Sequence, residues 1–118
     1  MSVIAPVNTF PFQTSQDVAI TTWPDVAAGD TCNPVRLGVW SDRTVQVGGS
    51  FGGATVYVQG SNDDTEYFTL TDPQGNPLSF VAPGLEAIIE LPAFLRPLVT
   101  GGDVTTNVKI IISGRRSV

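Results

Sequence analysis

Acidic side chains are the groups in this sequence whose types and spacing come closest to those needed for chemistry. Asp63, Asp64 and Glu66 fall in one short polar stretch, and Glu86 and Glu90 share one side of an alternating segment. Glycoside hydrolysis uses two carboxyl groups across a sugar, one of them with a raised pKa. The residues around these acids indicate no environment that would raise a pKa. The first stretch also offers oxygen ligands for Ca²⁺, but it lacks the EF-hand spacing. We therefore interpret it as a solvated turn, and whether it holds an ion stays open.

Other reactive groups are scarce. The 118 residues include no histidine and a single cysteine, Cys32, so a Cys/His metal site, a histidine-based triad and an internal disulfide are all excluded. We expect Cys32 to be a small buried apolar residue, because burial makes a thiol inert. The glycine-rich run 48–53 lacks the lysine of a phosphate-binding loop, and no helical pattern follows it. We interpret it as a bent connector anchored by Phe51, and we predict a protein that is not an enzyme and has no metal or cofactor.

The net charge, the length and the apolar runs of the sequence argue against a nucleic-acid-binding, membrane-spanning or secreted protein. The chain has a net charge of −5 and one lysine, whereas a nucleic-acid surface needs clustered Lys and Arg. No apolar run approaches the roughly 20 residues of a membrane-spanning helix. The N-terminal residues do not resemble a secretory signal, so we expect synthesis in a reducing cytoplasm. The length indicates one domain, and the 14% of charged residues fits either a surface covered by partners or a sandwich rich in Thr and Gly.

A period of two in the hydrophobic pattern predicts short β-strands along most of the chain. The clearest case is residues 54–59, where Val56 and Val58 should face the core. A polar turn then leads to a returning strand at 66–70, with Phe68 and Leu70 inward. Further strands are expected at residues 17–23, 35–40, 44–47, 77–81, 85–91, 92–99 and 104–113.

Prolines and turn-forming residues between these segments set the expected ends of the strands. Pro24 should end the first strand, residues 25–33 should form a loop, and residues 41–43 should form a turn. The segment 85–91 has helix-favouring residues, but Pro92 follows it and its period fits a strand better. The prolines of 92–99 predict an edge strand or a bulge. In 104–113 one face should carry Val104, Thr106, Val108, Ile110 and Ile112.

Together these segments predict an all-β fold, an antiparallel two-sheet β-sandwich of the jelly-roll kind, over residues 17–118. Residues 1–16 should form an extended N-terminal arm, because its prolines block helix. Val7, Phe10 and Phe12 of this arm should pack either on the domain's own sandwich or on a neighbouring subunit. We take these three residues, with Arg115 and Arg116 of a short basic tail, as candidate partner-binding residues.

Two tyrosines form a second candidate site. Tyr57 and Tyr67 both fall on the outer face of the expected hairpin, where they would be close if the strands pair across 60–65. Such a patch is either a platform for a sugar or a cross-strand aromatic pair that stabilises the sheet by less than about 1 kcal/mol. The second interpretation is favoured.

Three stretches of the sequence carry a resemblance: VYVQGSNDDTEYFTL at 56–70, TDPQGNPLSF at 71–80 and LRPLVTGG at 95–102. Together they resemble small all-β virion proteins of tailed bacteriophages, in which a strand, a GSND turn and an RP strand recur. Here Tyr67 and Phe68 follow the turn where tryptophan is expected. The resemblance covers about half of the chain, and its motifs are structural turns.

The resemblance implies a capsid decoration (cement) protein with a jelly-roll-like fold. Such a protein would sit on the outer surface of the head, bridge subunits of the major capsid protein, and be made in the host cytoplasm. It would also contact itself, as a dimer or trimer, and an extended arm suits such contacts. Two alternatives remain: a tail, connector or fibre component of the virion, and a carbohydrate-binding module that uses the two tyrosines.

Overall fold

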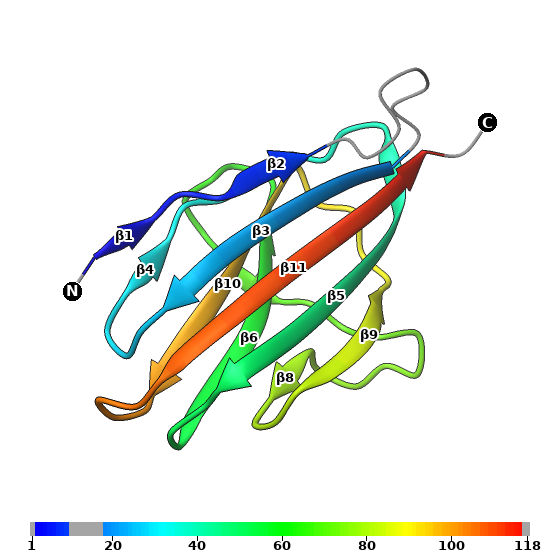
Figure 1. The fold of residues 1–118 in the computed structure, drawn as a ribbon. Helices are drawn as coiled ribbons and strands as arrows, with labels where there is room; N and C mark the ends of the chain where they lie inside the picture. Colours follow the sequence, from blue (N-terminus) through cyan, green and yellow to red (C-terminus); the bar gives the residue numbers. More distant parts are fainter. Residues whose placement is uncertain (1, 10–17, 117–118) are drawn as a thin grey trace.

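The computed structural model describes residues 2–9 and 18–116, and this part of the chain contains strands and turns without a helix (Figure 1). The predicted all-β sandwich is confirmed. The larger sheet has five antiparallel strands in the order β2 (Val7–Thr9), β3 (Val18–Val26), β11 (Asn107–Arg116), β5 (Trp40–Ser50) and β9 (Gly84–Ile88).

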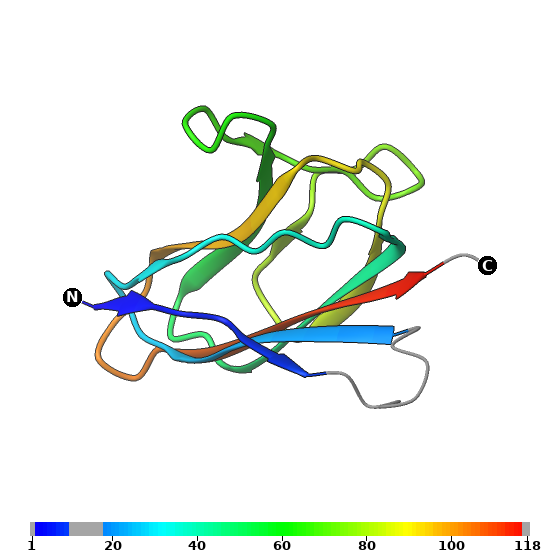
Figure 2. The same cartoon turned by 90° about the horizontal axis from the view of Figure 1, so that it is seen from above.

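The smaller sheet has four antiparallel strands and lies over the first, as the view in Figure 2 shows. Its members are β10 (Phe94–Gly101), β6 (Ala54–Ser61), β7 (Phe68–Thr69) and β8 (Ser79–Phe80), with β6 in contact with the other three. A short parallel pair, β1 (Val3–Ile4) with β4 (Thr31–Cys32), stands beside the two sheets. β5 and β6 follow each other in the chain but belong to different sheets, so the glycine-rich connector between them crosses from one layer to the other.

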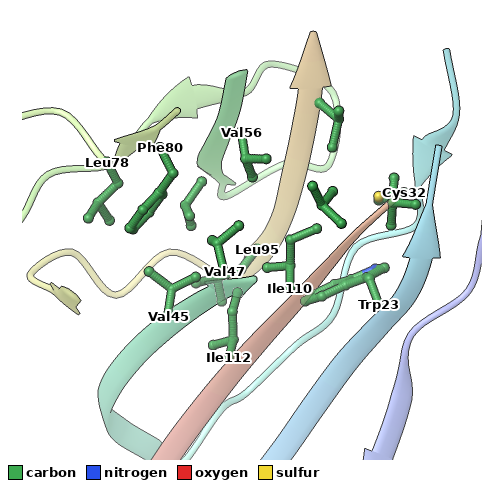
Figure 3. Close-up of a cluster of buried hydrophobic side chains, with 14 of the residues drawn as sticks. Trp23, Cys32, Val45, Val47, Val56, Leu78, Phe80, Leu95, Ile110 and Ile112 are labelled. Carbon is green, nitrogen blue, oxygen red and sulfur yellow. The ribbon is translucent and has the colours of Figure 1, made fainter. Parts of the chain in front are cut away.

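The hydrophobic core fills the space between the two sheets (Figure 3). From the larger sheet come Trp23, Val45, Val47, Ile110 and Ile112, and from the smaller sheet and its loops come Val56, Leu78, Phe80 and Leu95. Each sheet buries one face because successive side chains along a strand point to opposite sides. Burial of a side chain of this size stabilises the fold by roughly 1.5–3 kcal/mol before conformational entropy is counted.

The hairpin of β6 and β7 follows the prediction for its first strand more closely than for its second. Val56 and Val58 are fully buried, and Leu70 is buried after β7. The prediction for Phe68 is wrong, because 67% of this residue is exposed. Phe68 pairs with Gly60 near the end of β6, beside an open hollow, so its ring has little core to enter.

The first long strand does not end at Pro24. β3 continues to Val26 because a β-bulge accommodates the proline. Trp23 pairs with Ile110 and Val26 with Val108, so Pro24 and Asp25 together stand opposite one residue of β11. Asp25 has a φ of 53°, which produces the local bend. A proline is tolerated at a bulge because its missing N–H is not needed there.

The chain between β4 and β5 differs most from the prediction. Within the expected strand 35–40, Val35 pairs in an isolated bridge with Leu95, Trp40 begins β5, and residues 36–39 belong to no strand. A tight turn follows, in which Gly38 has a φ of 46° and the Trp40 N–H donates to Leu37 O over 2.8 Å. The expected turn at 41–43 is therefore wrong, because these residues are already part of β5.

The later strands agree with the prediction in kind, but the bounds and the buried side of one of them differ. Residues 84–88 form a strand, β9, as preferred over a helix, and the expected strand 85–91 ends at Ile88. Ile88 is buried, whereas the alternating Leu85, Ile89 and Leu91 are exposed. β10 contains Pro97 and is the outer strand of its sheet, as its prolines predicted. In β11 the expected face is buried from Thr106 onward, whereas Val104 is fully exposed because it lies in the preceding turn.

Candidate interaction surfaces

The N-terminal residues lie on the domain's own sandwich. β2 pairs with β3 at the edge of the larger sheet, and Val7 within it is 53% exposed. β1 is fastened to the 27–32 segment: the Thr31 N–H donates to Ser2 O over 2.8 Å, and the Ser2 N–H donates to Asp30 Oδ1 over 2.8 Å. The predicted partner residues Phe10 and Phe12 lie outside the described residues.

The two C-terminal arginines belong to a strand and not to a tail. Arg115 pairs with Val18 on one side and Asp42 on the other, and Arg116 pairs with Trp40. Both arginines are exposed. β11 lies at the centre of the larger sheet, so their side chains are carried by a fixed backbone. Val7 and Arg115 are far apart in the sequence, but both belong to the five-stranded sheet.

The outer face of the smaller sheet carries the second candidate site. The Arg96 guanidinium lies 3.7 Å from the centroid of the Tyr67 ring, and Arg96 Nε donates to Gln59 Oε1 over 3.3 Å. Tyr57 stands further along β6, opposite Leu98 on β10 and Ser79 on β8. The partner of the Tyr67 ring is therefore an arginine that the sequence patterns did not connect with it. On the same strand as Arg96, the ring of Phe94 lies 4.7 Å from the Arg36 guanidinium carbon.

The acidic stretch between β6 and β7 uses its first carboxylate to hold the turn. Asp63 Oδ1 accepts hydrogen bonds from the N–H groups of Thr65 and Glu66, at 2.9 and 3.0 Å, and from the Ser61 hydroxyl. The Glu66 and Thr65 N–H groups lower the pKa of Asp63, because they favour its charged form. Within the described residues, no group of three or more His, Cys, Asp or Glu is placed to hold a metal ion.

The other acidic candidates are separated by the fold. Glu86 lies in β9, where it pairs with Val45 of β5. Glu90 lies beyond the end of this strand and accepts hydrogen bonds from the hydroxyl and the N–H of Thr71. Burial acts to raise the pKa of Glu90, but these hydrogen bonds outweigh it and the pKa is lowered. Glu90 is thus held as a charged acceptor for the Thr71 backbone.

Cys32 is buried, as expected from the sequence, although in the short strand β4 rather than in a loop. Burial raises the pKa of its thiol to about 12, and the negative charge of Asp30 acts in the same direction. A thiol with this pKa is almost wholly protonated near neutral pH, so it is a poor nucleophile. Across residues 2–9 and 18–116 there is also no helix with the length and hydropathy to cross a membrane.

A basic residue that the sequence analysis assigned to a turn is buried in the structure. Arg43 is only 5% exposed and lines a hollow of about 580 Å³ at the β5–β9 end of the larger sheet. The alternation of 44–47 contains the signal that could have found it, because Val45 and Val47 face inward and a strand one residue longer puts position 43 on the same side. The strand was not extended to position 43 because the Ser-Asp-Arg sequence at 41–43 has the composition of a turn.

Exposed apolar side chains gather around the same region. Leu85 and Ile89, on and just after the edge strand β9, are more than half exposed, and so is Leu91 in the following loop. Ile89 and Leu91 line the hollow of Arg43, and Leu91 also lines a neighbouring hollow together with Phe68. Grouped exposed apolar side chains of this kind mark surfaces that bind other molecules.

Comparisons with known proteins find a shared fold and no shared family. No protein-family model matches the chain, and no curated protein matches it significantly. The crystal structure of the SPBc2 prophage-derived protein YomS is similar, with a TM-score of 0.58 over 82% of this chain and 93% of that chain. The two sequences are 12% identical. At this identity the similarity shows that the two chains share a fold.

Proposed function

We propose that this protein is a structural component of a tailed-phage particle, a capsid decoration (cement) protein on the outer surface of the head. In this role it bridges subunits of the major capsid protein, contacts itself as a dimer or trimer, and performs no catalysis. The observation that carries the proposal is its fold, which it shares with a prophage-derived protein over most of both chains.

The sequence motifs that resemble phage virion proteins provide independent support. The GSND turn corresponds to the end of β6 and the loop after it, and the RP motif lies in β10, which pairs with β6 over its whole length. The two motifs are therefore neighbours in one sheet. Two motifs that are far apart in the sequence but adjacent in the fold are a more specific resemblance than either motif alone.

The surface is also suited to repeated contact. β2 and β9 are the two edge strands of the larger sheet, and β9 carries exposed apolar side chains. A sheet edge can accept an extended segment from a neighbour through main-chain hydrogen bonds. On a shell with many equivalent positions, a weak contact of this kind is strengthened each time a subunit binds more than one neighbour.

The copy number in purified particles tests the proposal most directly. A shell protein should be present on the order of hundreds of copies, whereas a part that follows the symmetry of the tail should be present at about 6 or 12. Quantitative mass spectrometry against the major capsid protein measures this ratio. A low copy number would assign the protein to the tail or connector, and absence from the particle would reject a virion role altogether.

A second experiment tests the stabilising role. Heads assembled without this protein should release DNA at a lower temperature than complete heads, and adding the purified protein back should restore the difference. Genome release can be followed with a DNA-binding dye during heating. Heads that are equally robust with and without the protein would contradict the cementing function even if the copy number is high.

A further inference from the structure

The buried arginine of β5 occupies an unusual position for a charged side chain. Arg43 points to the same side of the larger sheet as Val45 and pairs with Gly114 and Ile88 on the two neighbouring strands. A Cβ on Gly114 would meet the Trp40 side chain at 2.6 Å, so this glycine lets Trp40 pack closely against the end of β11. The stem of Arg43 is therefore enclosed by the ends of three strands.

Only part of the Arg43 guanidinium has a hydrogen-bond partner. Nε donates to Trp40 O over 2.8 Å, whereas the buried Nη1 has no acceptor. Burial lowers the pKa of the side chain, and the described residues place no carboxylate against it. An arginine stays charged in proteins, so this is a buried cation with an unused donor. Such a group is costly to the free protein and gains most from an anionic ligand.

The lining of the hollow next to this group suits a ligand with a single negative charge. Arg43 and Arg115 line it together with Asp42, so its lining carries an excess of one positive charge. Ile89 and Leu91 form an exposed apolar border on the same hollow. A single negative charge next to apolar groups matches this lining better than a doubly charged phosphate does. A volume of about 580 Å³ accommodates a few residues of a peptide.

We propose that this hollow is a binding site for a carboxylate carried by an extended peptide segment of a protein partner, with the guanidinium of Arg43, which lines the hollow, as the group that recognises it. Arg115 adds charge at the mouth of the site, and the apolar border contacts the residues next to the carboxylate. An arginine–carboxylate hydrogen bond is charge-assisted, so it is stronger than a neutral one. The edge of β9 lies beside the hollow and is available to a strand of the partner. This site does not depend on the phage role proposed above.

Nuclear magnetic resonance can observe the Arg43 side chain directly. Its Nε–H is hydrogen-bonded to Trp40 O in a residue that is only 5% exposed, which slows its exchange with water. We expect a saturable shift of this signal when acetate replaces chloride at constant ionic strength and pH. Two peptides then separate the sources of the carboxylate: N-acetyl-Leu-Glu-Leu-amide offers a side chain, and N-acetyl-Leu-Leu with a free C-terminus offers a main-chain carboxylate. N-acetyl-Leu-Leu-amide is the neutral control.

Variants establish which group binds. Arg43→Met keeps an apolar stem of similar length and removes the unpaired charge, so the variant is expected to fold, and it should bind the better peptide at least about tenfold more weakly. Arg115→Gln should weaken binding by a smaller factor, since this residue is exposed. Arg36→Gln, on the other sheet edge at Phe94, should bind as the wild type does. If Arg43→Met does not fold, the titration of the wild type and the binding of the peptide to Arg115→Gln still test whether the hollow binds a carboxylate.

Three results would overturn the proposal. The first is an Arg43 signal that none of the carboxylate probes shifts in a saturable way. The second is equal binding of the neutral peptide, which would leave only the apolar border. The third is tighter binding of inorganic phosphate than of any carboxylate, because the lining would then recognise a different anion.

Discussion

The Arg96 guanidinium lies over the Tyr67 ring, with its central carbon 3.7 Å from the ring centroid, and joins a loop of the smaller sheet to its outer strand. Arg96 belongs to β10, whereas Tyr67 ends the loop between β6 and β7. The same guanidinium donates to Gln59 of β6. One side chain therefore connects β10, β6 and the loop that follows β6.

Removing this cation should loosen the loop and destabilise the sheet. We expect Arg96→Met to lower the free energy of unfolding by about 0.5–1 kcal/mol, the usual contribution of a cation–π contact at the surface. Lys109→Met, which removes an exposed cation from β11, should change it by less than about 0.5 kcal/mol. Urea unfolding of both variants measures the difference. Equal losses in the two variants would show that the contact with Tyr67 contributes nothing specific.

Tyr67 should lose its hydroxyl proton at a higher pH than a free tyrosine does. Burial raises the pKa of Tyr67 to about 12, and the hydrogen bond that its hydroxyl donates to Asp64 acts in the same direction. Since a free tyrosine titrates near pH 10, the unfolded chain loses this proton first. The contribution of Tyr67 to stability is thus complete below about pH 10 and is lost as the pH rises through the folded-state pKa.

Tyrosinate absorbance measured against pH tests this order. The folded protein should show a late step that disappears in Tyr67→Phe and persists in Tyr57→Phe. A late step that survives the loss of Tyr67 would mean that another group produces it.

The sequence predicted which face of a strand is buried more reliably than which strands are neighbours. Strict alternation placed Val56, Val58, Ile110 and Ile112 in the core, because the period of two leaves no other face for them. Alternation carries no information about partners, so the parallel pairing of β1 with β4 could not be predicted. Nor could the contact between Tyr67 and Arg96, which depends on the register of β10 against β6.

The errors come from residues that have two structural uses. Proline ends many strands, but at position 24 a bulge removes the need for its N–H. The Ser-Asp-Arg sequence at 41–43 has the composition of a turn, yet the real turn lies at Gly38, whose φ of 46° favours glycine. Once that turn is misplaced, Arg43 is assigned to solvent, and the hollow beside it cannot be found from the sequence.

Two adjacent glycines of β5 should respond very differently to alanine. A Cβ on Gly49 would lie 2.4 Å from the backbone oxygen of Asn107, and its φ of 100° is unfavourable for other residues. Gly49→Ala should therefore cost about 2–4 kcal/mol. A Cβ on Gly48 would meet no atom within 4 Å, so Gly48→Ala should be neutral or stabilise by up to about 1 kcal/mol. Thermal unfolding of the pair measures this contrast, and similar midpoints would show that β5 and β11 adjust freely at this place.

A buried threonine joins two turns at one end of the sandwich. The Thr106 hydroxyl donates to Phe51 O over 2.8 Å and accepts from the Asp103 N–H over 3.0 Å. Thr106→Val keeps the shape but leaves both backbone groups without this partner, so it should cost about 1–3 kcal/mol. Thr100→Val, at an exposed position of β10, should cost less than about 0.5 kcal/mol. Denaturant unfolding compares them. If Thr106→Val is as stable as the wild type, water replaces the hydroxyl at this turn.

The thiol of Cys32 should react only when the fold opens. Burial raises its pKa to about 12, so at a pH near the ordinary thiol value of about 8.5 the folded protein contains almost no thiolate. We expect an aromatic disulfide reagent to label the native protein very slowly and the urea-unfolded protein rapidly. Because labelling then requires opening, Gly49→Ala should be labelled faster than the wild type, whereas Gly48→Ala should not. Rapid labelling of the native wild type, unaffected by either variant, would show that β4 opens independently of the sandwich and that the β1–β4 pair is not part of its cooperative unit.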